Sequence, residues 1–391
     1  MEIPDKPASN KPLKVCMVVE SAAAGVGRHV IDLVDLLIED HGVDVHLVWS
    51  PVRADAEFSG WVERLGLPNF PLEMSRHPGL RDVVAISKIR QYLHRKGPFH
   101  IAHGHSSKGG AIARLACVGT NVQVVYTPHA FVTMNPSMNH GARLVFSAAE
   151  MVLAKMTSQL VAVSPEEASY AQRFGFRPSQ IAVIPNCIRP ICLPEREIVR
   201  RELGFHDDDV VIGFVGRFAI QKHPVMLVEA FASVVKSNPQ ALLLMIGDGP
   251  LMSEVRRTVD RYGIGLRVRL LGARAGRPLM PGFDIFALPS RFEGLPYVVL
   301  EAMSAGLPLV ITSGANCSVL VEQGVNGLIV PTENVERFAM ALTDLVSNIG
   351  RRNAMGQASK RRVSQFDLPR MVSETHKVYT ILANGRDLRP S

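Results

Sequence analysis

Cysteine is scarce in this chain, and the spacing of its cysteines excludes two kinds of structure. The 391 residues contain five cysteines, an odd number with no Cys-x-x-Cys pair. We therefore expect neither a disulfide framework nor a zinc site built on cysteine. The five positions are Cys16, Cys117, Cys187, Cys192 and Cys317.

Long apolar runs are also missing. Residues 1–14 are polar and lack the apolar core of a secretory signal. The longest apolar tract, Leu144 to Val163, is interrupted by Glu150 and Lys155, so it is too broken to span a bilayer. We expect a cytoplasmic protein, with a peripheral position on the inner face of a membrane left open.

Aromatic residues make up only 6% of the chain, and no dense basic tract is interleaved with them, which argues against nucleic acid as a partner. The formal net charge of +7 still favours an anionic ligand, such as a nucleotide, a lipid diphosphate or a phospholipid surface. The apolar fraction of 47% and the length predict a globular protein of two or three domains.

Short apolar strands, each followed by a loop and a helix, recur along the chain and predict an α/β fold with parallel, doubly wound sheets. In the first unit, a strand at 14–19 leads to a loop with Gly25 and Gly27 and a helix from about Val30. A dehydrogenase fingerprint is excluded, because Val30 replaces its third glycine and the next strand ends at Ser50 rather than an acidic residue.

A polar segment follows the strand that begins at Ile101. It offers histidines, two hydroxyls and a lysine before a helix expected at 111–117, an arrangement that suits an anion. Extended backbone places His103 and His105 on one face. A metal there lacks a third ligand nearby in the sequence, so a structural or acceptor-lining role is favoured. The polar residues are His103, His105, Ser106, Ser107 and Lys108.

Two carboxylates lie eight residues apart in the stretch from Phe283 to Pro308. A buried strand is expected at 284–288, and a helix with Pro296 in its first turn follows the loop. Glu293 then sits at the carboxyl end of a strand, where open α/β sheets bind ligands, and Glu301 lies about two turns into the helix. The pair can hold two parts of one elongated ligand.

Two further loops follow apolar strands. Arg217 and Lys222 lie between the strand at 210–215 and a helix, and both are permanent cationic donors suited to phosphate. Gly247, Asp248 and Gly249 form a tight turn after the strand at 241–246.

These motifs, Glu293-Gly-Leu-Pro with Glu301-Ala and Gly216-Arg217 with Lys222, resemble the large retaining glycosyltransferase family 4. The resemblance covers about residues 14–385. It implies a GT-B fold, in which two Rossmann-like parallel-sheet domains face a cleft and a C-terminal helix crosses back to the first domain. The implied divisions are a disordered tail at 1–13, an acceptor-side domain at 14–187, a nucleotide-sugar domain at 188–366 and a crossover helix and tail at 367–391.

The resemblance also implies roles for single residues. Arg217 and Lys222 hold the donor diphosphate, Glu293 orients the sugar hydroxyls, and His129 touches the donor sugar as a neutral imidazole. Glu301 accepts from the ribose hydroxyls. The catalytic residues would be His129, Arg217, Lys222 and Glu293. The donor-binding residues would be Gly25, Gly27, Gly216, Gly247, Asp248, Gly249, Phe292, Gly294, Leu295 and Glu301.

The implied activity is retaining hexosyl transfer from a UDP- or GDP-linked sugar by front-face attack. No metal ligand is assigned, and turnover is expected to be metal-independent and to need no cofactor. The segment His103-Gly-His105-Ser106-Ser107-Lys108 resembles a subgroup found in bacterial exopolysaccharide assembly. It implies a glycan or polyprenyl-diphosphate-linked acceptor, with an anionic membrane surface as a further partner.

The chain departs from the family pattern at two places. Cys187 replaces the glycine of a Pro-Asn-Gly-Ile turn, and Ser313 to Val319 lacks the family's Gly-Gly-x-x-Glu. The first departure bears only on the geometry of the turn, and the second is the one sequence hint of a lost or changed activity. Two other interpretations stay open: another GT-B enzyme, such as a phosphorylase or an epimerase, and a non-catalytic nucleotide-sugar-binding partner.

Overall fold

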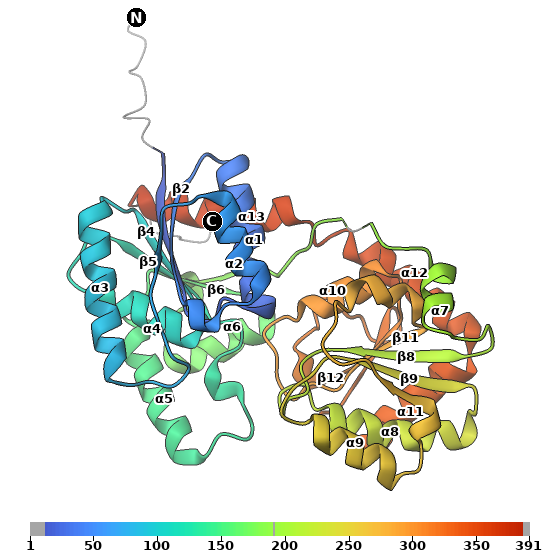
Figure 1. The fold of residues 1–391 in the computed structure, drawn as a ribbon. Coiled ribbons are helices and arrows are strands. Elements are labelled where there is room, and N and C mark those ends of the chain that lie inside the picture. Colours follow the sequence, from blue (N-terminus) through green and yellow to red (C-terminus); the bar gives the residue numbers. More distant parts are fainter. Residues whose placement is uncertain (1–11, 191, 386–391) are drawn as a thin grey trace, which may run out of the picture.

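The fold consists of two parallel β-sheets, each covered by helices on both faces (Figure 1). The computed structural model describes residues 12–190 and 192–385. Most of the expected N-terminal tail, residues 1–11, and the last six residues of the expected C-terminal tail lie outside the described residues.

The first sheet has seven strands in the order β3-β2-β1-β4-β5-β6-β7, all parallel. Strand β1 is apolar from Val15 to Val19 because both faces of the sheet are covered, whereas its neighbour β4 carries His103 and His105. In β1, Val15 and Met17 face one core cluster, whereas Cys16 and Val18 face another. The strands are β1 (Lys14–Val19), β2 (Asp44–Trp49), β3 (Asn69–Pro71), β4 (Ile101–His105), β5 (Gln123–Thr127), β6 (Gln159–Ala162) and β7 (Ile181–Val183). The helices are α1 (Ala24–Glu39), α2 (Ala56–Leu65), α3 (Leu80–Lys96), α4 (Ser106–Ala116), α5 (His140–Ala154) and α6 (Pro165–Ala171).

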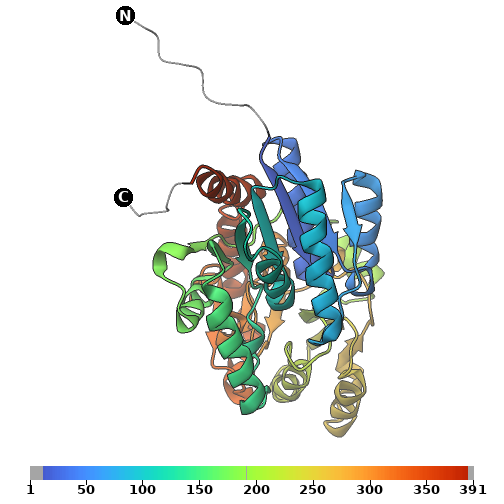
Figure 2. The same ribbon diagram turned by 90° about the vertical axis from the view of Figure 1, so that its left-hand side faces the viewer.

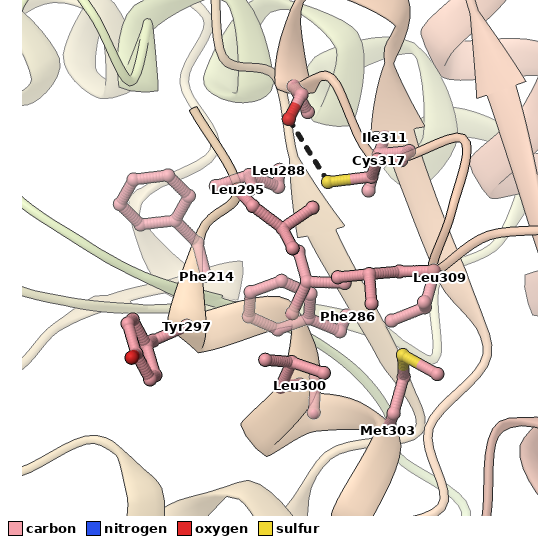
Figure 3. Close-up of a cluster of buried hydrophobic side chains, with 14 of the residues drawn as sticks. Phe214, Phe286, Leu288, Leu295, Tyr297, Leu300, Met303, Leu309, Ile311 and Cys317 are labelled. Carbon is pink, nitrogen blue, oxygen red and sulfur yellow. Dashed lines mark hydrogen bonds between the residues drawn. The ribbon is translucent and has the colours of Figure 1, made fainter. Parts of the chain in front are cut away.

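The second sheet has six parallel strands in the order β10-β9-β8-β11-β12-β13. Leu300 and Met303 of α10 pack toward Phe286 and Leu309 on neighbouring strands, which fixes the helix over the sheet (Figure 3). The strands are β8 (Val210–Val215), β9 (Ala241–Ile246), β10 (Val268–Leu270), β11 (Ile285–Leu288), β12 (Leu309–Thr312) and β13 (Gly327–Val330). The helices are α7 (Arg196–Glu202), α8 (Pro224–Ser237), α9 (Met252–Arg261), α10 (Tyr297–Ser304), α11 (Val335–Ser347) and α12 (Ile349–Val363).

The last helix, α13 (Leu368–Ala383), leaves the second half and packs against α1 of the first (Figures 1 and 2). The hydroxyl of Tyr379 lies 2.5 Å from Nδ1 of His103 in β4. The GT-B arrangement with a returning C-terminal helix, predicted from the sequence, is therefore confirmed.

The two chain segments that connect the halves lie side by side. Ile188 forms a parallel bridge with Asp367, and the Ile188 N–H donates to the Phe366 carbonyl oxygen at 3.2 Å. This pairing supports the divisions at 187/188 and 366/367, which stay our proposal for the domain boundaries.

Two helices begin earlier than the sequence predicts. The expected loops around Gly27 and Gly110 are the first turns of α1 and α4, so those loop assignments are wrong. Glycine weakens a helix, but here it permits close packing. A Cβ at Gly110 would lie 2.3 Å from the Tyr126 ring, and one at Gly27 would lie 3.1 Å from the backbone of Ala22. Within the ranges 12–190 and 192–385, we find no helix that is long and apolar enough to cross a membrane.

Candidate active site

Glu293 lies in the loop between β11 and α10, and its buried carboxylate has three side-chain partners. Oε1 forms an ion pair with Nζ of Lys222 at 2.8 Å and accepts a hydrogen bond from the Ser290 hydroxyl at 2.8 Å. Oε2 accepts from Nε2 of Gln221 at 3.1 Å. A buried carboxylate needs such compensation, and these contacts fix its orientation. Lys222 and Glu293, assigned to different parts of the donor, thus form one ion pair.

The segment from Ser313 to Val319, which departs from the family pattern, contacts the backbone of Glu293. Nδ2 of Asn316 donates to the carbonyl oxygen of Glu293 at 2.6 Å. Gly314 packs so closely that a Cβ there would lie 2.3 Å from the Arg291 carbonyl oxygen. The segment is therefore connected to the site through the side-chain amide of Asn316.

Gly294 brings the two halves of the molecule into contact. A Cβ at this position would lie 2.9 Å from the nitrogen of Ala130 and 2.9 Å from the carbonyl carbon of His129. The absence of a side chain thus lets the Glu293 loop reach the residues that follow β5. This contact places His129 and Glu293 on opposite sides of one junction.

The backbone at His129 is held in an uncommon conformation. His129 and Ala130 have φ angles of 53° and 79°, which non-glycine residues rarely adopt and which concentrate at functional sites. Oε1 of Glu167 accepts from the Ala130 N–H at 2.6 Å, and Oε2 accepts from the Val163 N–H at 2.8 Å. Burial raises the pKa of Glu167 to about 7, although the two N–H donors oppose the shift.

Three histidines gather at this point. Nε2 of His129 lies 3.2 Å from Nδ1 of His105, and Nδ1 of His29 lies 3.0 Å from Oδ1 of Asn186. Burial lowers the pKa of His29 to about 4 and lowers the pKa values of His105 and His129 well below the usual range. The three rings are therefore neutral at pH 7.

His103 lies on the same face as His105, as extended backbone predicts, with 4.1 Å between the ring centroids. Its nitrogens are already engaged inside the protein. Nδ1 contacts Tyr379, and Nε2 lies 2.8 Å from the Thr127 hydroxyl. This geometry suits a positioning role for His103 between the sheet and α13.

The remaining polar residues of this segment lie in the first turn of α4, and each has a protein partner. The Ser106 hydroxyl donates to Glu20 at 3.3 Å, and the Ser107 hydroxyl accepts from the Val132 N–H at 3.1 Å. Nζ of Lys108 lies 2.7 Å from Asp82 and donates to two carbonyl oxygens, those of residues 75 and 77. Lys108 thus fastens the preceding loop.

In the second half of the molecule, the loop after β8 and the loop after β9 pack closely together at the carboxyl edge of the sheet. A Cβ at Gly247 would lie 1.9 Å from the Gly216 carbonyl oxygen, and one at Gly249 would lie 2.5 Å from the Phe218 carbonyl oxygen. Both glycines have φ angles in the region that favours glycine, 141° and 156°. Asp248 is exposed in the same turn, and its Oδ1 accepts from the Gly249 N–H at 2.6 Å.

Arg217 projects from this pair of loops. Its side chain is exposed, and it forms no ion pair with any of the described residues. Lys222, by contrast, is half-buried beside Glu293. A phosphate at the loop edge therefore meets one guanidinium that is not already neutralised and one ammonium whose charge is partly compensated.

Glu301 borders a cavity of about 290 Å³ between α1, α10 and the connecting segment. Arg28, Arg189, Arg277 and Tyr297 also line this cavity. Burial raises the pKa of Glu301, while Arg277 and Arg28 oppose the shift. The cavity combines a carboxylate that can accept from hydroxyls with an excess of guanidinium charge that attracts an anion.

Three other predicted donor residues, Gly25, Phe292 and Leu295, are not among the residues that line this cavity. A Cβ at Gly25 would lie 3.7 Å from the Tyr297 ring, so α1 approaches α10 closely. The Phe292 carbonyl oxygen accepts from Gln221 at 3.2 Å, and the Leu295 carbonyl oxygen accepts from Nδ2 of Asn186 at 2.7 Å.

Several residues of the site were not singled out from the sequence. Gln221 and Ser290 adjoin predicted residues, so a search of the loops next to Lys222 and Glu293 would have found them. His29 lies one helical turn after Gly25, which is a weak signal. Arg28, Arg277, Glu167 and Asn186 gave no sequence signal of their role, because their partners lie far away along the chain.

Two parallel sheets whose carboxyl edges bring polar clusters together define a GT-B protein. Comparisons with known proteins identify its family. The family model for glycosyl transferases group 1 matches residues 195–362, and that for glycosyltransferase family 4 matches residues 23–190. The chain therefore belongs to the family 4 glycosyltransferases and is a transferase that uses a nucleotide-sugar donor.

Curated relatives include enzymes of bacterial glycan synthesis. The chain is 28% identical over 316 residues to the UDP-Gal:alpha-D-GlcNAc-diphosphoundecaprenol alpha-1,3-galactosyltransferase of Escherichia coli, covering 77% of this chain and 80% of the relative. It is 26% identical over 294 residues to the putative glycosyltransferase EpsD of Bacillus subtilis, covering 72% and 76%.

Among solved structures, Anabaena HepE in complex with UDP superimposes with a TM-score of 0.79 at 21% identity, covering 94% of this chain and 100% of HepE. WaaG, a glycosyltransferase involved in lipopolysaccharide biosynthesis, superimposes with a TM-score of 0.72 at 17% identity, covering 95% and 99%. At these identities the likeness establishes the GT-B fold.

Proposed function

We propose that this chain is a retaining hexosyltransferase of bacterial surface or exopolysaccharide synthesis. It transfers a sugar from a UDP- or GDP-sugar to a polyprenyl-diphosphate-linked acceptor at the cytoplasmic face of the membrane. The observation that carries the proposal is the ion pair between Lys222 and the buried Glu293 carboxylate, which Gly294 places against the turn that holds His129. The acceptor named for the Escherichia coli relative is a sugar on diphosphoundecaprenol, which supports the acceptor class.

The proposed donor lies across the edge of the second sheet. Its diphosphate meets Arg217 and Lys222, and the ammonium of Lys222 keeps N–H donors besides the one directed at Glu293. These cations stabilise the negative charge that develops on the leaving nucleotide. Electrostatic stabilisation of this kind is usually the largest single contribution to catalysis. The ribose hydroxyls donate to Glu301 at the wall of the guanidinium-lined cavity.

The proposed transfer needs no covalent intermediate on the protein. The bond between the sugar C1 and the donor phosphate oxygen breaks, and the acceptor oxygen forms a new bond to C1 on the same face. The acceptor proton passes to the leaving phosphate oxygen. Glu293 accepts from sugar hydroxyls, and neutral His129 donates to one, so both side chains serve to orient the sugar.

The proposed membrane contact is the exposed face of α5, in the lower left part of Figure 1. Leu144, Val145 and Val152 are 71%, 66% and 55% exposed. The opposite face is anchored by the buried pair of Arg114 and Glu150, whose atoms approach to 2.6 Å. An amphipathic helix with this exposure suits the interface of a bilayer.

The experiment is nucleoside-diphosphate release from a panel of UDP- and GDP-sugars, with and without a membrane lipid extract. The proposal predicts release from one donor that rises when the lipid-linked acceptor is present. Release that requires inorganic phosphate and no acceptor would identify a phosphorylase. Donor binding without release under any condition would identify a non-catalytic partner.

The membrane contact is tested separately by sedimentation with anionic vesicles. We expect binding at low ionic strength that weakens with added salt, because surface charges are screened. Leu144→Glu should reduce it. Leu266→Glu is the matched control, since Leu266 is 99% exposed in the other half of the molecule. Equal binding by both variants would exclude α5 as the contact.

A further inference from the structure

We propose that His29, His105 and His129 form a binding site for a divalent transition metal of the zinc class. One ligand nitrogen from each of the three rings can be chosen so that all lie within 4.8 Å of one another. The residues come from α1, from the end of β4 and from the turn after β5, so their proximity exists only in the folded chain.

The distances in the cluster are close to those of a tetrahedral site. Zinc lies about 2.0–2.1 Å from imidazole nitrogen, so two ligands of a tetrahedral ion are about 3.3 Å apart. Nδ1 of His105 and Nε2 of His129 are 3.2 Å apart. One edge of the ligand set therefore already has the required length, and the chosen nitrogens of all three residues lie within 4.8 Å of one another.

The protonation pattern leaves nitrogen lone pairs available. Nδ1 of His29 faces the amide oxygen of Asn186, an acceptor, so Nδ1 carries the proton and Nε2 is free to bind a metal. Asn186 is itself fixed, because its Nδ2 donates to the carbonyl oxygen of Leu295. Such an outer partner orients a ligating histidine and sets its tautomer.

The side chain of His105 is fully buried, so the surrounding protein fixes its position. Its Nδ1, which faces Nε2 of His129, is the nitrogen that would bind the metal, while its Nε2 has no hydrogen-bond partner among the described residues. Burial also keeps all three rings neutral, which is the form that binds metal.

The site differs from the one considered from the sequence. The pair His103 and His105 lacked a third ligand, and His103 is committed to Tyr379 and Thr127. In the structure, the residues that cluster with His105 are His29 and His129, which are distant in sequence, rather than His103. The half-buried His129 leaves the fourth position accessible from the junction of the two halves, where water or an anionic oxygen can complete the shell.

A consequence follows that rests on the proposed function. A metal that takes Nε2 of His129 leaves that nitrogen without a proton to donate to a sugar hydroxyl, so occupancy should inhibit transfer. The metal-free enzyme would be the active form, in agreement with the expected metal-independent turnover. Added Zn²⁺ should lower nucleoside-diphosphate release, and excess EDTA should restore it.

The site itself is tested by titrating the metal-stripped, full-length protein with Co²⁺ and recording its visible absorption. We expect one equivalent to produce the intense bands of four-coordinate cobalt, and Zn²⁺ to displace it. His105→Ala should abolish the bands. Asn186→Ala should weaken metal affinity about 10- to 100-fold, since it removes only the outer partner.

The matched control is the double variant His41→Ala with His376→Ala. These two rings stack with 4.2 Å between their centroids, just after the end of α1 and on α13, and form a close histidine pair outside the proposed site. The control should keep the bands. If His105→Ala fails to fold, His129→Gln replaces it, because His129 is only half-buried.

Three results would overturn the proposed site: no four-coordinate bands in the wild type, bands that persist in the histidine variants, or bands lost in the control. Four-coordinate bands together with zinc-insensitive turnover would overturn only the inhibitory consequence. Because the spectrum needs no donor or acceptor, failure of the site is distinguishable from failure of the proposed transferase activity.

Discussion

The polar clusters around Glu293 and His129, which meet at Gly294, bury their ionisable side chains in opposite ways. Around Glu293 the buried groups are charged and compensated, with an ammonium at 2.8 Å and two neutral donors. Around His129 the buried groups are imidazoles that lose their charge instead. A carboxylate is buried only with a partner, whereas an imidazole is easily buried in its neutral form.

The difference affects how each cluster responds to substitution. Removing a charge from the Glu293 cluster leaves its partner buried and unpaired, so large effects on chemistry are expected. Removing one contact from the histidine cluster costs about the value of a neutral hydrogen bond. Four substitutions test this contrast.

The largest effect is expected for Lys222→Ala. The substitution removes a cation from the leaving diphosphate and leaves Glu293 without its ion pair. We expect nucleoside-diphosphate release to fall about 100-fold, within the range for loss of charge-assisted contacts. Lys236→Ala at the exposed far end of α8 is the control and should retain full activity. Equal loss in both variants would contradict a specific role for Lys222.

The pH dependence of stability tests the role of Glu167 in the turn that carries His129. Its pKa is about 7 in the folded chain and 4.5 in the reference state, so the folded chain binds more protons between these values. The free energy of unfolding should therefore fall as pH rises from about 4.5 to about 7, on the order of 2 kcal/mol from this group. Urea unfolding of the wild type and Glu167→Gln measures it, since the variant lacks this slope. Identical pH profiles would contradict the assignment.

Glu301→Gln should act on binding more than on the chemical step. The side chain lies at the cavity wall, about one turn into α10 rather than the predicted two, because the helix begins only at Tyr297. We expect KM for the nucleotide sugar to rise about 10-fold with kcat nearly unchanged, because a ribose contact is present in both ground and transition states. Steady-state kinetics separates the two constants. A loss confined to kcat would place Glu301 in the chemistry instead.

The smallest effect is expected at the link between α13 and the histidine side. Tyr379→Phe removes the hydroxyl that contacts His103 and should lower the free energy of unfolding by about 1 kcal/mol. Tyr262→Phe is the control, because Tyr262 is 44% exposed on the other half. If the two variants have the same denaturant midpoint, the buried hydrogen bond adds nothing to stability.

The contrast also explains what the sequence revealed. The second half was predictable because its site residues lie within short motifs, such as Glu293 with Gly294 and Arg217 with Lys222. The strands at Val210–Val215 and Ala241–Ile246 were predicted with their exact bounds, since buried parallel strands are uninterrupted apolar runs.

The histidine side was less predictable because long-range packing assembles it. No local pattern indicates that His29 meets His105 or that Glu167 binds the N–H of Ala130, 37 residues earlier. The glycines at the starts of α1 and α4 misled the sequence reasoning. Glycine disfavours helix locally, and only the facing elements, such as the Tyr126 ring at Gly110, require it there.

The central claim is that the Glu293 cluster orients a donor sugar beside His129. The most direct test measures nucleoside-diphosphate release by the wild type and Glu293→Ala, with a single donor and a lipid-linked acceptor, alongside donor affinity. We predict that release collapses in the variant while donor binding through Arg217 and Glu301 persists. Wild-type release rates in Glu293→Ala would contradict the claim.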